Sequence, residues 1–217
     1  GHTASGFWID TNRQTTIHGL YAAGDVAGGC PQKYVTGALA EGKIASFAII
    51  EQLKSDSDET TSTIEKQAQV ILKDYEKIRS TQNGLFTIDD LEEAMQKVMD
   101  QYAGGIGTHY QFNGKQLAMA EEKIRQLQVL AEGLKAEDMH ELMFVYELKE
   151  RLTVCLSVIA HLGARKETRW HSFAENLDYP QKSDEWLRYV NSRLVDGKIE
   201  IIYRDLVEGG TTYEHRN

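Results

Sequence analysis

Residues 63–164 contain no proline and show a helical spacing of apolar residues, which restricts the fold more than any other part of the sequence. Apolar side chains recur every three or four positions there, which is the spacing of one face of an α-helix. The pattern predicts four helices, over residues 63–80, 88–103, 113–133 and 136–163. Because the connections between them are short, we expect neighbouring helices to pack antiparallel in one bundle.

The last of these helices has the broadest apolar stripe, so we expect it to be the most deeply buried. Thr87, three residues before Asp90, predicts a capping interaction at a helix start, and Asn83-Gly84 predicts a turn just before it. The methionines suit core packing better than cofactor binding, because their side chains adapt to irregular gaps. They are Met95, Met99, Met119, Met139 and Met143.

Residues 1–54 have a different character and are rich in glycine and alanine. The short apolar run Leu20–Ala23 ends at Gly24-Asp25, and a glycine-rich loop and a helical spacing over residues 36–53 follow. The expected order is therefore a short buried strand, a loop and a helix. Residues 55–62 are polar and acidic and contain no apolar side chain, which predicts a linker.

A third segment, residues 165–217, follows the bundle. Its alternating stretch Lys198–Arg204 predicts a strand that is paired in a hairpin through Asp196-Gly197. The expected fold is mainly α, with a helical bundle over residues 63–164 and short β segments around it.

The net charge of −9 is concentrated in the middle of the chain. Residues 1–54 carry four acids and four bases, whereas residues 55–164 carry nineteen acids and eleven bases. An acidic surface repels nucleic-acid phosphates, so we expect no nucleic-acid partner. Such a surface could help to attract a basic partner, but charged helix faces are more often only solvated.

Cys30 and Cys155 are the only two cysteines. Two thiols cannot form a disulfide framework or a four-thiolate cluster, so any iron–sulfur centre must lie on another chain. The histidines show no metal-ligand spacing, and we predict no metal site. The chain has no run of eighteen apolar residues, and its first twenty residues lack the order of a secretory signal. We therefore expect no membrane span and a cytoplasmic location.

Gly24-Asp25 is the strongest local indication of chemistry. Small residues at a strand end let a cofactor approach the backbone closely, and the Asp25 carboxylate is then placed to accept hydrogen bonds from ribitol or ribose hydroxyl groups. A tight turn capped by Asp25 explains the same residues without a cofactor. The pattern alone leaves both interpretations open.

The stretch Thr15–Asp25 resembles the second flavin-binding motif of flavoproteins with two dinucleotide-binding domains. Residues 29–45 resemble the loop and helix that close over the isoalloxazine ring in those proteins. A helix amino terminus suits the negative charge that develops on a reduced flavin. The resemblance implies that FAD is bound by Gly24, Asp25, Thr36, Gly37, Ala38 and Leu39.

The chain resembles the C-terminal part of the flavoprotein subunits of the fumarate reductase, succinate dehydrogenase and adenylylsulfate reductase superfamily. The first two enzymes carry a substrate-facing arginine where this chain has Lys33, which is a poorer partner for a carboxylate. Residues 40–43, Ala-Glu-Gly-Lys, are similar to the Ala-Glu-Gly-Arg of adenylylsulfate reductase alpha subunits, and the likeness continues to Glu167–Trp170 and Asp178–Pro180. Residues 1–54 are accordingly expected to be the tail of an α/β FAD-binding domain.

This resemblance implies an FAD-dependent conversion of adenylylsulfate to AMP and sulfite, with electrons from an iron–sulfur subunit. His2 falls in a His-x-x-x-Gly segment, His2–Gly6, where the superfamily has a histidine near the substrate and the flavin. His2 is therefore the implied catalytic residue, because an imidazole relays protons near neutral pH. A vector-derived Gly-His remnant and an ordinary surface histidine remain open as explanations of His2.

Arg169, Trp170 and His171 lie where the superfamily often has an arginine near the rim of the active site. A structural junction held by ion pairs with Glu167 or Asp178 explains these residues equally well. We therefore predict no catalytic role for any of the three.

The sequence has no GxGxxG segment to hold the ADP half of FAD, and the substrate-capping domain of the superfamily is missing. We expect a fragment of a larger enzyme that binds FAD weakly or not at all on its own. Two alternative functions remain, a dicarboxylate oxidoreductase and a non-catalytic docking module whose acidic bundle binds a partner subunit. Exposure of Leu20, Tyr21 and Tyr34 would favour self-association of the fragment.

Overall fold

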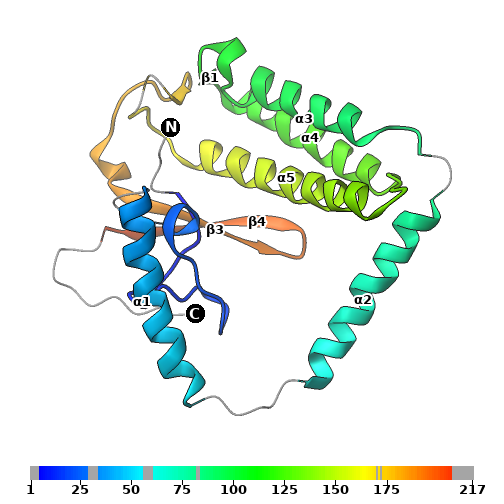
Figure 1. The fold of residues 1–217 in the computed structure, drawn as a ribbon. Coiled ribbons are helices and arrows are strands. Elements are labelled where there is room, and N and C mark those ends of the chain that lie inside the picture. The colour runs from blue at the N-terminus through cyan, green and yellow to red at the C-terminus, as the bar shows by residue number, and fades with distance from the viewer. Residues whose placement is uncertain are drawn as a thin grey trace. The chain divides into compact units, whose positions relative to one another are not determined.

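The computed structural model describes residues 5–28, 34–55, 61–81, 84–169, 171 and 173–206. The chain divides into two compact units, Gly1–Thr61 with Val207–Asn217, and Ser62–Leu206. Helices dominate the described residues and the strands are short (Figure 1), which confirms the prediction of a mainly α fold.

The described residues of the first unit form irregular turns and then a long helix, α1 (Val35–Leu53). A short 3₁₀ helix, η1 (Gly24–Val26), precedes it. In place of the strand expected over Leu20–Ala23, the described residues make single β bridges, among them Gln14 with Tyr21 and Phe7 with Ala27. A regular strand needs a continuous ladder of partners, and these isolated pairs do not supply one.

The helix α1 is apolar on almost every side, yet only Glu41 and Ala45 are buried in it. Val35, Leu39 and Leu53 are each at least 69% exposed. A helix with apolar residues all round is typical of the interior of a larger domain. The exposed side chains of α1 are therefore consistent with the expectation that residues 1–54 are part of such a domain.

The second unit is built on three packed helices, α3 (Ile88–Tyr102), α4 (Gly114–Ala131) and α5 (Met139–Ala164). Figure 1 shows them side by side, in green to yellow. Their shared core contains the fully buried side chains that make the bundle: Leu91, Ile124, Leu134, Val145, Leu148 and Leu152. The stripe predicted for the last helix is thus the centre of the bundle.

The helix α2 (Thr61–Ser80) joins this bundle only through its C-terminal part. Ile78 is buried in the core and Tyr75 packs against it, whereas Val70 and Ile71 are exposed. The predicted four-helix bundle is therefore corrected to a three-helix bundle with a partly attached fourth helix. The helical spacing gave α2 an apolar stripe, but spacing alone does not tell whether a stripe has a partner.

The methionine prediction is correct only in part. Met95 is buried and Met99 lies partly buried against the core, but Met119, Met139 and Met143 are exposed. Met139 contacts the Tyr75 hydroxyl group of α2 through its sulfur atom.

Side-chain caps define where the bundle helices begin. Thr87 accepts a hydrogen bond from the Asp90 backbone while the Asp90 carboxylate accepts one from the Thr87 backbone, so the predicted capping box is present. Asn113 caps α4 and Asp138 caps α5 through side-chain oxygen atoms that accept hydrogen bonds from backbone amides. Such caps satisfy amide groups that have no acceptor inside the helix.

Two small sheets complete the second unit. β1 (Gln111–Phe112) pairs in parallel with β2 (Glu175–Asn176), and β3 (Arg188–Val195) pairs antiparallel with β4 (Lys198–Asp205). Asp196 and Gly197 connect β3 to β4 with φ angles of +48° and +74°. Two successive left-handed residues are typical of the type I′ hairpin turn, as Asp-Gly predicts.

Two further 3₁₀ helices, η2 (Ile106–Thr108) and η3 (Asp184–Trp186), lie in the connections. Among the described helices, none is both long enough and apolar enough to cross a membrane.

Candidate functional site

The turn at Gly24 has a shape that requires glycine. Its φ angle is +76°, and a Cβ atom built on it would lie 3.2 Å from the Cβ of Ala38 in the first turns of α1. A side chain at position 24 would therefore meet both a strained backbone and a close neighbour. The Ala27 amide donates a 3.0 Å hydrogen bond to the Gly24 carbonyl and closes the turn.

Asp25 follows Gly24 on this turn and its side chain is exposed. A carboxylate on the outside of a glycine turn is accessible to hydroxyl groups of a ligand that approaches the turn. The sequence left open whether Gly24-Asp25 is a cofactor-binding turn or a tight turn without a ligand, and this geometry fits both. The structure also shows that Gly24 packs on the start of α1.

The start of α1 offers backbone amide groups. The N-cap residue Tyr34 supplies no side-chain cap, and the first turn contains no acid. Thr36, Ala38 and Leu39 are exposed and Gly37 is partly buried. A helix start of this kind attracts an electron-rich group, because its first amides have no acceptor within the helix and the helix dipole is positive there.

The structure thus brings together six of the seven predicted site residues, Gly24 and Asp25 from the turn and Thr36–Leu39 from the helix. The seventh, His2, lies outside the described residues, as does Lys33.

An ion pair that no sequence pattern predicted lies behind the turn. The Glu41 carboxylate lies 3.3 Å from the Arg13 Nε atom and accepts a 3.3 Å hydrogen bond from the Gly24 amide. The Glu41 side chain is 7% exposed. The sequence signal that could have found it is a lone acid on an otherwise apolar helix face, which needs a partner when it is buried.

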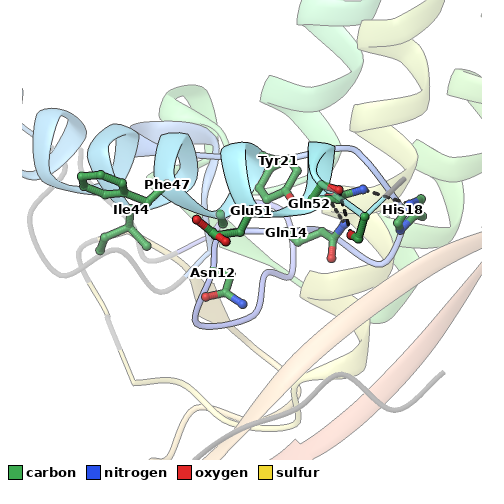
Figure 2. A pocket seen from close by; sticks show the side chains of 10 residues that line it. Asn12, Gln14, His18, Tyr21, Ile44, Phe47, Glu51 and Gln52 are labelled. Carbon is green, nitrogen blue, oxygen red and sulfur yellow. Dashed lines mark hydrogen bonds between the residues drawn. The ribbon is translucent and has the colours of Figure 1, made fainter. Parts of the chain in front are cut away.

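An open groove of about 710 Å³ runs along the C-terminal half of α1 (Figure 2). Ile44, Phe47 and Ala48 form its apolar part, and Gln14, His18 and Tyr21 face them from the preceding turns. Gln52 connects the two sides, since it is hydrogen-bonded to Tyr21, to Gln14 at 3.2 Å and to His18 at 2.9 Å. The described residues that line the groove include one acid, Glu51, and no lysine, arginine or cysteine.

In the second unit, the most strongly connected polar group is the carboxylate of Glu167, whose side chain is fully buried. Arg165 donates to it at 2.7 Å, Arg169 donates to both of its oxygens at 2.9 Å, and the Ser183 amide donates at 3.0 Å. Burial alone would raise the pKa of Glu167, but the hydrogen bonds from Arg169, Ser183 and Arg165 outweigh it and hold the pKa below its ordinary value.

Arg169 could lie at the rim of an active site or in a structural junction, and the contacts of this cluster favour the junction. Its guanidinium group is occupied by Glu167 and by the Ser183 carbonyl at 3.0 Å. Arg169 therefore acts within the unit as part of a structural junction. His171 forms an exposed pair with Glu175 at 3.3 Å.

His161 forms a second polar cluster, where α5 meets β3. Its Nε2 atom lies 2.9 Å from the Ser192 hydroxyl, which is 3.4 Å from the Ser157 hydroxyl. Burial and, to a smaller extent, the charge of Arg165 lower the pKa of His161, so its neutral form is favoured. Burial raises the pKa of the Cys155 thiol, which makes it a poor nucleophile.

No group of three or more histidine, cysteine, aspartate or glutamate side chains in the described parts of the chain could hold a metal ion.

The chain is similar to several oxidoreductases of known sequence. It is 27% identical over 202 residues to the adenylylsulfate reductase alpha subunit of Megalodesulfovibrio gigas, a match that covers 87% of this chain and 30% of the relative. It is 27% identical over 190 residues to an uncharacterized FAD-dependent oxidoreductase of Methanocaldococcus jannaschii, with 85% of this chain and 33% of the relative covered. No protein-family model matches the chain.

Solved structures give the same result. The adenylylsulfate reductase of Archaeoglobus fulgidus is 31% identical and superposes with a TM-score of 0.77 over 94% of this chain and 34% of its own. The quinol fumarate reductase of Escherichia coli has the same fold, with a TM-score of 0.82, 20% identity, and 98% and 38% of the two chains covered. The resemblance to adenylylsulfate reductase alpha and fumarate reductase flavoprotein subunits is therefore confirmed, and the chain spans about a third of the length of these relatives.

Proposed function

We propose that this chain is the C-terminal part of an FAD-dependent flavoprotein subunit that reduces adenylylsulfate to AMP and sulfite. The observation that carries the proposal is the contact between the Gly24-Asp25 turn and the first turns of α1, in a chain that is 31% identical to the Archaeoglobus fulgidus adenylylsulfate reductase.

The residues of this contact fit the edge of a flavin. The Asp25 carboxylate is exposed and would accept hydrogen bonds from the ribitol hydroxyl groups. The backbone at Thr36, Gly37, Ala38 and Leu39 would face the pyrimidine part of the ring, where the positive end of the α1 dipole stabilises negative charge. Gly24, which is buried against Ala38, would hold the turn close to the start of α1.

When bound, FAD would supply the transfer of two electrons to the substrate. The role of this chain would be to bind and orient one side of the cofactor and to stabilise charge on it. His2 would donate a hydrogen bond or a proton to an anionic oxygen of the substrate, as the resemblance implies.

Residues 1–54 would complete the FAD-binding domain of the full-length subunit, residues 55–62 would link it to the helical domain of residues 63–164, and residues 165–217 would form the tail with the β hairpin. The chain alone lacks a GxGxxG segment for the pyrophosphate. We therefore expect the 217-residue chain to be colourless and to bind FAD weakly or not at all.

An iron–sulfur subunit would deliver the electrons, because the two cysteines cannot form a cluster on this chain. The test of the proposed reaction is the assay of AMP-dependent sulfite oxidation by the full-length subunit with such a partner. Activity with adenylylsulfate and none with fumarate supports the proposal. Activity with fumarate and none with adenylylsulfate would assign the chain to the dicarboxylate enzymes.

That dicarboxylate reaction is the second candidate, and the fold shared with quinol fumarate reductase favours it. Lys33 argues against it, because a lysine presents a point charge where an arginine would bind a carboxylate with two parallel hydrogen bonds.

A non-catalytic docking role for the acidic bundle is the third candidate. Several of its acids already have basic partners on the same or a neighbouring helix, such as Glu93 with Lys97 at 2.7 Å and Glu92 with Arg151 at 2.6 Å. Co-purification of the iron–sulfur protein with the full-length subunit, before and after neutralisation of Glu121, Glu122 and Glu150, tests the idea. A complex that is unaffected by these changes would refute docking through the acids.

A further inference from the structure

We infer that Glu41 is a positioning residue that holds the Gly24-Asp25 turn in the shape that presents Asp25 to a ligand. The relevance of this contact to flavin binding rests on the proposed function.

Glu41 is an acid in an environment that would normally exclude one. It lies in the second turn of α1, and its side chain is 7% exposed, whereas most apolar side chains of the same helix are exposed. A carboxylate that is withdrawn from water loses its hydration, so it remains charged only if other groups replace the water. Its position therefore depends on specific partners.

Two of these partners lie on segments that are distant in sequence. The Oε1 atom is 3.3 Å from the Arg13 Nε atom, and the Oε2 atom accepts a 3.3 Å hydrogen bond from the Gly24 amide. One carboxylate thus connects α1 to two separate turns. A bond to a charged acceptor is stronger than one between neutral groups.

Both turns have an unusual backbone at the point of contact. Arg13 has a φ angle of +70° and Gly24 one of +76°, and non-glycine residues rarely adopt such values. Arg13 is fixed further, because its Nη1 atom donates to the Thr11 carbonyl at 2.8 Å and its own carbonyl accepts from the Ala22 amide at 2.9 Å. Glu41 thus contacts two positions, Arg13 and Gly24, where the chain has a left-handed conformation.

Asp25 is the next residue after Gly24, whose amide donates a hydrogen bond to the Glu41 carboxylate. The orientation of the Gly24 peptide group sets the direction in which the chain leaves the turn, and therefore where the Asp25 side chain emerges. The Glu41 carboxylate itself is buried behind the turn and is not accessible to a ligand. It would thus affect binding through Gly24 and Asp25 and not by direct contact.

The first test uses the 217-residue chain without cofactor. Glu41→Gln keeps the size of the side chain and removes its charge, and we expect the amide hydrogen of Gly24 to exchange with solvent about tenfold faster by NMR. The matched control is Glu51→Gln, on the same helix, whose side chain is 71% exposed and which should leave Gly24 exchange unchanged. The Thr15 amide, which donates to the Leu20 carbonyl, reports whether the unit remains folded in both variants.

The second test uses the full-length subunit and separates positioning from a general structural role. Glu41→Gln should weaken FAD binding about tenfold in the wild-type background and less than about twofold in an Asp25→Asn background, because groups that act through one another are not additive. Equal effects in the two backgrounds, or unchanged Gly24 exchange in the first test, would overturn the inference. Failure of the wild-type full-length subunit to bind FAD would instead overturn the proposed function, whatever the exchange of Gly24 shows.

Discussion

Arg169 donates hydrogen bonds to both carboxylate oxygens of Glu167, each at 2.9 Å, from a position where sequence likeness alone would have suggested the rim of an active site. The pair lies at the junction between the bundle and the C-terminal segment. Arg165 extends it, since it donates to Glu167 and also to the carbonyl groups of Trp186 and Arg188 at 2.9 and 3.1 Å. Glu167 therefore ties the end of α5 to the chain that leads into the hairpin.

Removal of the Glu167 charge should destabilise the second unit. Glu167→Gln leaves two arginines without their buried partner, and we expect a loss of about 3 kcal/mol in the free energy of unfolding at neutral pH. Because the folded-state pKa of Glu167 is lowered, its stabilisation is fully present above the ordinary pKa of 4.5 and is lost as the pH falls further, through the folded-state value.

Urea unfolding of wild type and variant, followed by circular dichroism between neutral and acidic pH, measures both effects. The control is Glu150→Gln, an exposed acid of α5, which should change the stability little. A Glu167→Gln variant as stable as the control would show that the cluster does not contribute to stability.

Replacement of glycine by alanine should have opposite effects on stability at Gly197 and at Gly163. Gly197 has a φ angle of +74° in the hairpin turn, so Gly197→Ala should destabilise the second unit by about 1 kcal/mol. Gly163 lies in α5, where a Cβ would meet Leu117 at an ordinary 3.6 Å, so Gly163→Ala should stabilise it by up to about 1 kcal/mol. Urea unfolding distinguishes the two, and equal changes of the same sign would contradict this account.

Local patterns were enough to predict most of the second unit. The periodicity over residues 88–103, 113–133 and 136–163 and the Asp196-Gly197 turn correspond to α3, α4, α5 and the β3–β4 hairpin, because each depends on residues that are close in sequence. The attachment of α2 could not be predicted this way. Its stripe contains buried Ile78 and exposed Ile71 alike, and the difference depends on whether a distant helix lies opposite.

Small residues followed by an acid indicated a turn at Gly24-Asp25, and the structure has a turn there. The flavin-binding role of Gly24, Asp25 and Thr36–Leu39 stays a prediction. The Glu41 contacts with Arg13 and Gly24 could not be predicted, because they join positions 17 and 28 residues apart through the tertiary structure.

The exposed apolar side chains of α1 predict self-association of the 217-residue chain. Ile50 and Leu53 are 50% and 69% exposed, and a contiguous apolar surface favours burial against another copy. Sedimentation should show an average mass that rises with concentration, and the double change Ile50→Glu with Leu53→Glu should reduce it. The control is Leu85→Glu, which changes one exposed apolar residue of the second unit. A wild-type chain that stays monomeric at high concentration would contradict the prediction.

The proposed function requires that Asp25 and the start of α1 form one side of a flavin site. The most direct measurement is the flavin content of the purified full-length subunit, read from its visible absorption, for wild type and for Asp25→Ala. We expect about one FAD per wild-type subunit and a large loss in the variant, because the ribitol hydroxyl groups lose their acceptor. A wild-type subunit without flavin, or a variant that retains it fully, would contradict the account.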